Sequence, residues 1–465
     1  MDTNPFLELT GDPIVDAGGY VLKFLQNEPH LEEKDMHGLI EYVTDIYIDS
    51  WDGKLHAFFL NSPITQAQFR GDQKKRETLK YYHSLLDDTS PFKEGYCRIS
   101  GRQTHLFAAG RDKYILSGSG TYLNFHHSFD EGLMLSKEVL IRTFFAPFGL
   151  MQLSDKIALI SSNDERISEF FVRQNCRANV RDLASGISAS ILKSPFNNPS
   201  NAIFNFVDEC LRQLRSIFFD GANKVSENAP SLTLYHFTNF AAGPDIAIHT
   251  LTSQVFKFYI HCTSSHLARA WLKFVKSHYR NSKAKAVFNS ETEVWEGKET
   301  FTYDDFRTWR NEILARLVNG SSILHHMARW SRYHPFPFKI AETYQTLVRN
   351  MEKRTLEKIR HIADFIVAHR EADFIENCIR RLHRAKSANE VRLFVLRLTE
   401  QNYHQDGKDP LVTLEDCAEY LFPDGGNWRE IRDLLLIAIY ERLHELKLKV
   451  AAEPMDDENE LITEN

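Results

Sequence analysis

The clearest pattern along this chain is the helical spacing of apolar residues in its last third. In LEKIRHIADFIVAH and the segment after it, apolar side chains recur every three or four positions, at Leu356, Ile359, Ala363, Ile366, Val367, Phe374, Cys378, Ile379 and Leu382. Such spacing places one apolar stripe along each helix. The runs NEVRLFVLRLTEQ and WREIRDLLLIAIYERLHELKLKV have the same character. The sequence therefore predicts an all-α helical bundle over residues 334–450.

The residues before this bundle mix strand-like and helical patterns. YVTDIYIDSW and KLHAFFL are short runs rich in β-branched and aromatic residues. SLTLYHFTNF and IAIHTL flank the turn AAGPD, which predicts a hairpin-like pair of strands. From Ser265 the pattern is helical until YHPFPFK, where Pro335 and Pro337 interrupt helix. The predicted fold class is α+β, with a mixed α/β N-terminal domain over residues 1–333 and the C-terminal helical bundle after it.

Length and composition are those of an ordinary globular protein. The chain has 465 residues, of which 43% are hydrophobic and 26% charged, enough for two or three domains. No run approaches the roughly 18 consecutive apolar residues that span a bilayer, and the N-terminus has no signal-peptide pattern. We therefore expect a cytoplasmic chain without membrane contact. The six cysteines lie far apart, which indicates reduced and mostly buried thiols.

Charge is distributed unevenly along the chain. Residues 451–465 hold 6 acidic residues and no basic one, which predicts an acidic disordered tail. Residues 321–400 hold 15 Lys and Arg against 9 Asp and Glu. A basic helical segment suits a phosphate backbone, although ion pairs along a solvated helix face explain it as well. Its candidate cations are Arg349, Lys353, Arg354, Lys358, Arg360, Arg380, Arg381, Arg384 and Lys386.

No motif in the sequence defines a catalytic centre. SGSGTYLNF lacks the lysine of a phosphate-binding P-loop, and HExxH and GxSxG motifs are absent. His126, His127 and Asp130 suggest a metal site, as His325 and His326 do, but neighbouring histidines on a helix do not easily face one ion. We therefore expect no catalysis, no cofactor and no metal. A metal-dependent hydrolase at His126, His127 and Asp130, or a helical scaffold that binds only protein, are the alternatives.

Four local patterns follow one another between residues 10 and 330. They are TGDPIVDAGGYVLKFL at 10–25, SGSGTYLNFHHSFDEGLML at 117–135, LYHFTNFAAGPDIAIHTL at 234–251 and NEILARLVNGSSILHHM at 311–327. Together they resemble the large subunit of type I-B CRISPR surveillance complexes (Cascade), in its Cst-type branch. The helical C-terminal region resembles the small subunit of such complexes.

The resemblance implies a role in RNA-guided recognition of DNA. In such complexes the guide RNA reads the target sequence, while protein reads a short flanking motif, the PAM, and helps to open the duplex. The chain would then be a non-catalytic large subunit that binds guide RNA, target double-stranded DNA and the backbone, guide-end-binding and small subunits of Cascade. The complex would work with a helicase-nuclease or with transposition proteins, and the sequence does not separate these two.

Two glycine-containing loops are the predicted PAM contacts. Glycine lets backbone approach base edges closely, and asparagine reaches minor-groove acceptors. The predicted residues are Gly118, Ser119, Gly120 and Asn124 in the first loop, and Asn239 and Gly243 in the second. Ordinary hairpin turns explain the same residues equally well. The cations between Arg349 and Lys386 would hold the displaced DNA strand by charge alone.

The resemblance also implies a possible internal start of translation. Relatives often produce the small subunit from within the large-subunit gene, and Met351 is the predicted position, with Met327 as the alternative. Both methionines equally suit a helix core.

Two short segments depart from the resemblance. Many relatives carry two CxxC knuckles, a plausible structural zinc site, where this chain has Cys97-Arg98-Ile99-Ser100 and Leu135-Ser136-Lys137-Glu138. A tetrahedral zinc ion needs four good ligands, so we expect no zinc here. The acidic segment Asp16–Gly19 is unsuited to phosphate, and we expect it to start a core helix or to face another subunit.

Overall fold

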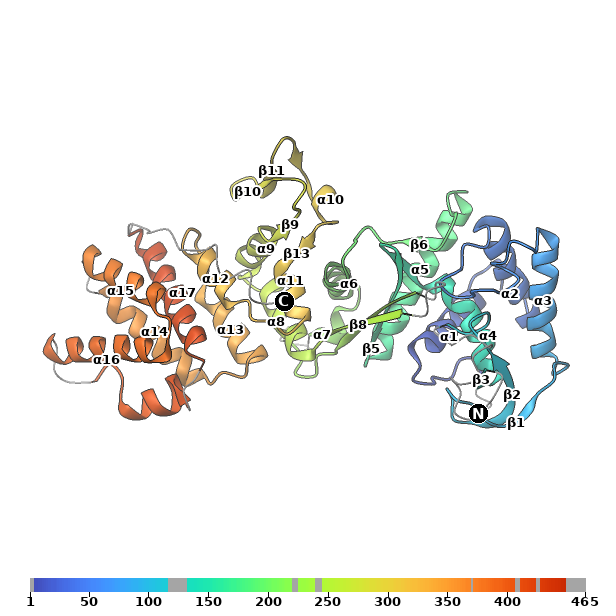
Figure 1. Ribbon diagram of the computed structural model, residues 1–465, viewed down its shortest axis with the longest axis horizontal. Helices are drawn as coiled ribbons and strands as arrows, with labels where there is room; N and C mark the ends of the chain where they lie inside the picture. The colour runs from blue at the N-terminus through green and yellow to red at the C-terminus, as the bar shows by residue number, and fades with distance from the viewer. Residues whose placement is uncertain are drawn as a thin grey trace. The chain divides into compact units, whose positions relative to one another are not determined.

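The computed structural model describes residues 4–115, 132–219, 225–238, 245–368, 371–405, 410–423 and 427–448. The chain folds as two compact units, one of residues 1–252 with 301–310 and the other of residues 253–300 with 311–465. Figure 1 shows their helices and strands. The predicted α+β class is confirmed, because sheets occur in the N-terminal and middle parts and the C-terminal region is helical.

The first unit combines helices with two sheets. Its helices are α1 (Pro13–Gln26), α2 (Met36–Asp45), α3 (Asp72–Leu86), α4 (Lys137–Phe145), α5 (Glu165–Ala184), α6 (Pro199–Gln213), α7 (Arg215–Phe218) and α10 (Tyr303–Phe306), with single turns η1 (Ile46–Ser50) and η3 (Ala146–Gly149). Its strands are β1 (Lys93–Tyr96), β2 (Gln103–Ala109), β3 (Leu133–Leu135), β4 (Met151–Leu153), β5 (Lys156–Ser162), β6 (Leu192–Lys193), β7 (Leu232–Thr238) and β8 (Asp245–Leu251).

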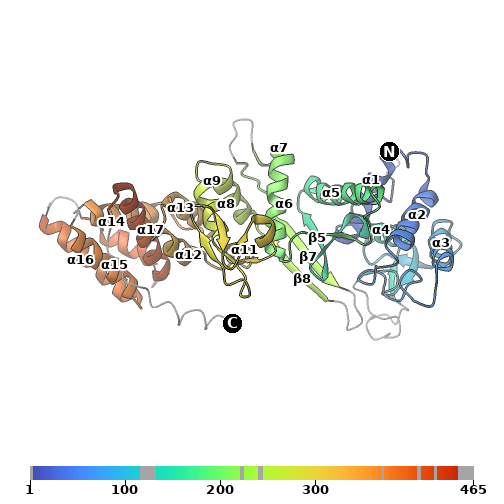
Figure 2. The ribbon, with the colours of Figure 1, turned by 90° about the horizontal axis from the view of Figure 1, so that it is seen from above.

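The larger sheet of this unit has the strand order β6-β4-β5-β7-β8. Strands β7 and β8 pair antiparallel from Leu232 opposite Leu251 to Thr238 opposite Asp245, so the predicted hairpin is confirmed. Helix α6 packs on these two strands, as Figure 2 shows. The smaller sheet, β1-β2-β3, is antiparallel throughout. Both predicted PAM loops therefore leave from the ends of antiparallel strand pairs, β2 with β3 and β7 with β8.

The second unit is mainly helical. Its helices are α8 (Ser253–Thr263), α9 (Ala268–Lys276), α11 (Glu312–Val318), α12 (Leu324–Ser331), α13 (Phe338–Val348), α14 (Lys353–Ala368), α15 (Ala372–Arg384), α16 (Ala388–Gln405) and α17 (Trp428–Leu446), with the turn η4 (Asp416–Leu421). Its strands are β9 (Tyr279–Arg280), β10 (Val287–Asn289) and β11 (Val294–Glu296), while β12 (Thr300–Phe301) and β13 (Arg310–Asn311) lie where the chain passes between the units.

The helices α14 to α17 form the C-terminal bundle (Figure 1). Helix α14 packs along α17, and the predicted apolar stripe of α14 is buried, including Leu356, Ile359 and Ile366. The same holds for Ile375 and Leu382 on α15. Burial of these side chains supplies the hydrophobic stabilisation of the bundle.

The second unit begins well before the division predicted at residue 334. Pro335 and Pro337 do separate two helices, α12 and α13. However, α13 packs against α8, where the rings of Phe258 and Tyr344 meet at 5.4 Å, and α12 packs against α17. The elements from α8 onward therefore share a core with the C-terminal helices, and the unit starts at Ser253.

Two simpler predictions concern thiols and membranes. All six cysteines are free thiols, and five of them are buried, as predicted. None of the helices in the described part of the chain is long and apolar enough to span a membrane.

Candidate nucleic-acid interface

The predicted PAM loops lie outside the described residues. This applies to Gly118, Ser119, Gly120 and Asn124 in the first loop, to Asn239 and Gly243 in the second, and to the alternative metal ligands His126, His127 and Asp130. The structure describes the residues on either side of each loop. Tyr114, just before the first loop, donates a hydrogen bond to Asp12 at 3.0 Å, and Ile115 is fully buried.

Four of the first five predicted cations are paired with acidic residues inside the second unit. Arg349 lies 3.2 Å from Glu430, and Arg360 lies 3.1 Å from Glu342 while stacking over the ring of Phe338. Such pairs leave less charge for an external phosphate. Lys353, the fifth cation, is exposed on the first turn of α14.

Asp416 binds the other two cations of this group. Its side chain is 1% exposed, lies 2.7 Å from Lys358 and 3.5 Å from Arg354, and accepts the backbone N–H of Thr413. Burial raises the pKa of Asp416, but the hydrogen bonds from Lys358 and Thr413 outweigh it and lower the pKa to about 2. Arg354 also lies over the ring of Tyr420. These contacts fasten α14 to η4, so Lys358 and Arg354 have a structural role.

The second group of predicted cations is exposed at the end of α15. Helix α15 buries one side, formed by Ile375, Cys378, Ile379 and Leu382. Its opposite side and the residues after it present Arg380, Arg381, Arg384 and Lys386, all exposed. Cations also stabilise a helix C-terminus by offsetting its partial negative charge. The position nevertheless gathers four positive charges within seven residues on the surface of the bundle.

The histidine pair His325–His326 does not form a metal centre with its neighbours. His326 contacts Glu312 through Nε2 at 2.8 Å, which ties α12 to the start of α11. The hydrogen bond from His326 is the largest cause that lowers the pKa of Glu312, to about 2. Among the described residues, no group of three His, Cys, Asp or Glu side chains is placed to hold a metal ion. The contact is therefore a link between two helices.

The two knuckle-like segments meet around Cys97. The thiol of Cys97 is buried and accepts the backbone N–H of Ser136 at 3.4 Å. Burial raises the pKa of the Cys97 thiol, but hydrogen bonds from the side chain of Ser100 and from backbone N–H groups lower it more, so the pKa lies below its ordinary value. One thiol beside the hydroxyl of Ser100 and the backbone N–H of Ser136 is a poor donor set for zinc. The residues present therefore do not fit a structural zinc ion.

The segment Asp16–Gly19 lies near the start of the core helix α1, which is one of the two outcomes expected for it. Asp12 caps α1 by accepting the N–H groups of Ile14 and Val15, and Pro13 occupies the first turn. Asp16 accepts hydrogen bonds from Thr10 and from Gly11 N–H. Its carboxylate is therefore committed to the fold.

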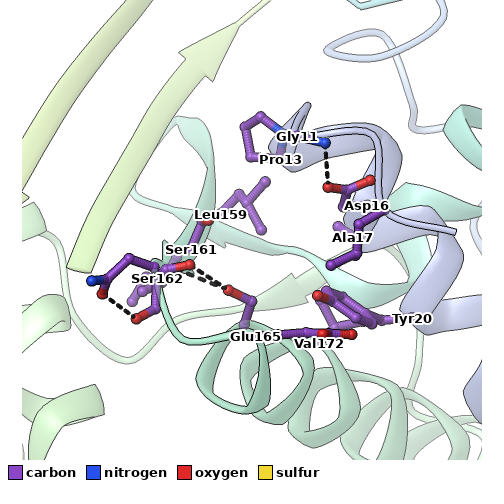
Figure 3. A pocket seen from close by; sticks show the side chains of 14 residues that line it. Gly11, Pro13, Asp16, Ala17, Tyr20, Leu159, Ser161, Ser162, Glu165 and Val172 are labelled. Carbon is purple, nitrogen blue, oxygen red and sulfur yellow. Dashed lines mark hydrogen bonds between the residues drawn. The ribbon is translucent and has the colours of Figure 1, made fainter. Parts of the chain in front are cut away.

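A cavity of 230 Å³ lies beside the start of α1, between α1, β5 and α5 (Figure 3). Its lining includes the carboxylates of Asp16 and Glu165 and no lysine or arginine among the described residues. The hydroxyl of Ser168 and the backbone of Ser162 are bonded to each other across the turn before α5. The negative lining makes the cavity unsuitable for a phosphate group.

Comparison with known proteins concerns the C-terminal part of the chain. Residues 330–464 match the family model of the DevT C-terminal domain. The match begins within α12 and includes α13 to α17, so it covers the region predicted as a separate helical bundle. It spans less than half of the chain. No curated protein and no solved structure matches the sequence.

Proposed function

We propose that this chain is the non-catalytic large subunit of a type I-B CRISPR RNA-guided DNA surveillance complex. It would recognise the PAM, help to open the target duplex and hold the displaced strand. Its partners would be guide RNA, target double-stranded DNA and the other Cascade subunits in the cytoplasm, with a helicase-nuclease or transposition proteins acting afterwards. The four sequence patterns between residues 10 and 330 support this proposal, and the DevT C-terminal match delimits its helical part.

The observation that carries the proposal is the exposed basic end of α15. Four of the first five cations are paired with acidic residues, so the surface that we propose for the displaced strand rests on the exposed cations at the end of α15, Arg380, Arg381, Arg384 and Lys386, and on Lys353 of α14. Backbone contacts of this kind hold a strand without reading its sequence.

The first experiment measures target binding by the co-expressed guide complex, with and without this chain, over a library of flanking motifs. The proposal predicts binding that depends on the flank only when the chain is present. Binding that is indifferent to the chain would refute it.

A second experiment tests the α15 surface with a double charge reversal, Arg380→Glu with Arg381→Glu. Its matched control is Arg76→Glu with Arg181→Glu, at two exposed positions on α3 and α5. We expect the α15 variant to bind every target about tenfold more weakly and to show a flatter dependence on salt, because two phosphate contacts are lost. Equal binding by the two variants would favour a scaffold that contacts only protein.

The PAM loops require a different readout. Asn124→Ala is expected to remove discrimination between flanking motifs, while binding to the best flank falls only to the level of the others. Equal loss on every flank would contradict the assignment of this loop to the PAM.

The structure places the two candidate internal starts differently. Met351 lies between α13 and α14, two residues before α14 begins, so a product from Met351 to Asn465 keeps α14 to α17 whole. Met327 is fully buried inside α12, and a start there cuts that helix. We therefore favour Met351. With a C-terminal tag, Met351→Leu should abolish the shorter product, and its persistence would reject this start site.

A further inference from the structure

The second unit carries a basic region that lies far from α15 in the sequence. Residues 246–290 contain seven Lys or Arg and no Asp or Glu. Six of the seven follow closely on one another in α9 and after it. We name them the α9 basic surface: Arg269, Lys273, Lys276, Arg280, Lys283 and Lys285.

Helix α9 is amphipathic, with three of these cations on one face and its apolar side chains on another. Trp271 and Phe274 are fully buried in the core of the unit. Arg269, Lys273 and Lys276 are spaced by four and three residues, which places them on one face of the helix. The remaining three cations follow in β9 and in the connection to β10, where all three are exposed. The six cations therefore lie within residues 269–285, three on one face of α9 and three exposed after it.

Two carboxylates already lie against this surface: Glu312 lies 3.9 Å from Arg280, and Glu293 contacts the cations of α9. Glu293, in the turn between β10 and β11, accepts a hydrogen bond from Lys276 at 2.8 Å. That hydrogen bond is the main cause that lowers the pKa of Glu293, and the charges of Lys273 and Arg269 act in the same direction. The three cations of α9 thus act together on a single anion, in the way that they would act on a phosphate group.

We propose that the α9 basic surface binds the phosphate backbone of double-stranded DNA without reading its sequence, and that Glu293 competes with the phosphate. Duplex DNA is the favoured occupant because the aromatic rings beside this surface are packed: Phe288 is half-buried and lies against the rings of Trp295 and Trp330. The rings of Trp271, Phe274 and Trp295 are all buried, whereas proteins that bind single strands stack bases on exposed aromatic rings. A duplex keeps its bases stacked inside and presents phosphates.

The test uses the full chain without guide RNA and a labelled duplex of scrambled sequence. Arg269→Glu with Lys273→Glu should weaken binding at low salt at least tenfold, and should flatten the slope of log K against log salt by about 2, because two phosphate contacts are lost. The matched control is again Arg76→Glu with Arg181→Glu, which should bind like the unchanged chain.

Glu293→Gln should change DNA affinity in the opposite direction. Removing the competing carboxylate frees Lys276, so binding should become about threefold tighter, a result that a merely destabilised protein would not give. Equal binding by the double reversal and its control, or no gain with Glu293→Gln, would overturn the proposal. A single strand that binds more tightly than the duplex would overturn the choice of occupant.

This result is separable from the proposed function. Flank-dependent binding by the guide complex can be lost while scrambled duplex still binds the α9 basic surface, and the converse can also be observed.

Discussion

Arg142 on α4 donates a hydrogen bond to Asp16 on α1 at 2.8 Å, and the Arg142 side chain is 2% exposed. The same guanidinium donates to the backbone carbonyls of Val15 and Glu8. Burial lowers the pKa of Arg142, and the nearby Asp16 opposes that shift. The start of α1 is therefore joined to α4 by a buried arginine, and the residues around Asp16 have a structural role.

Removing the carboxylate should destabilise the first unit strongly. In Asp16→Ala the buried charge of Arg142 loses its partner, which typically costs about 3 to 5 kcal/mol in the free energy of unfolding. Urea unfolding of the full chain measures the change. Asp35→Ala, which removes the cap of α2, is the control and should cost about 1 kcal/mol. Equal costs for the two variants would show that the buried pair does not stabilise the fold.

Gly18 should be required for the close packing of α1 against α4 at Arg142. A Cβ atom on Gly18 would lie 1.8 Å from the carbonyl oxygen of Arg142, so α1 and α4 would have to separate. Gly18→Ala should therefore lower the melting temperature by several degrees, as overpacking of about 1 to 3 kcal/mol does. A Cβ atom on Gly38 of α2 would meet Cβ and Cγ of Lys34 at 3.2 Å and Oδ1 of Asp35 at 3.5 Å, contacts that a shift of a few tenths of an ångström relieves, so Gly38→Ala should cost much less than Gly18→Ala. A neutral Gly18→Ala would show that the helices can move apart freely.

The parts of the fold that could be predicted from sequence are those with a local pattern. The helical spacing around Leu356 and Ile359 and the alternation in the β7–β8 hairpin were read correctly, because each periodicity is set by the element itself. The join between α8 and α13 was missed, because packing between distant helices leaves no local signal. For that reason the unit boundary fell at residue 334 in the sequence and at Ser253 in the structure.

The candidate site shows the same limit. The sequence identified the cations but not their partners, since Lys358 and Asp416 are separated by 58 positions and nothing local links them. The α9 basic surface, by contrast, was missed although a simple scan of charge would have found residues 246–290. For segment 321–400 the sequence left open whether its cations pair with acidic residues or meet phosphate, and the structure pairs four of the first five with carboxylates.

The ion pair of Lys358 should matter for folding and not for phosphate binding. Lys358→Met leaves the buried carboxylate of Asp416 with the more distant Arg354 and the Thr413 N–H, so we expect a loss of about 3 kcal/mol in the free energy of unfolding. Lys353→Met, at an exposed position on the same helix, should change stability by less than about 0.5 kcal/mol. Denaturant unfolding compares the two variants. If the two variants are equally stable, the ion pair of Lys358 does not stabilise the fold, and Lys358 is again a candidate contact for DNA.

Chelation should leave the first unit unchanged. The site around Cys97 offers one thiol and the hydroxyl of Ser100, while the hydroxyl of Ser136 caps α4, and such a set does not hold zinc well. Thermal unfolding in EDTA should therefore match thermal unfolding without it. A lower melting temperature that is restored by added zinc would contradict this reading of the two knuckle-like segments.

Acidification should destabilise the second unit through His278. This side chain is 7% exposed, and its Nδ1 lies 2.7 Å from the carbonyl oxygen of Phe274. Burial lowers the pKa of His278 to about 3; His326 and Arg280 act in the same direction, and the Phe274 carbonyl and Glu312 oppose them.

Between pH 6.5 and 3 the unfolded chain binds a proton at His278 and the folded chain does not, so stability falls as the pH decreases, by about 1.4 kcal/mol for each pH unit. His278→Asn removes this titration, and its free energy of unfolding should decline less steeply between pH 6 and pH 4 by about that amount per unit. His266→Asn, at an exposed position before α9, should follow the unchanged chain. Parallel pH profiles for the two variants would mean that His278 is already protonated in the folded protein.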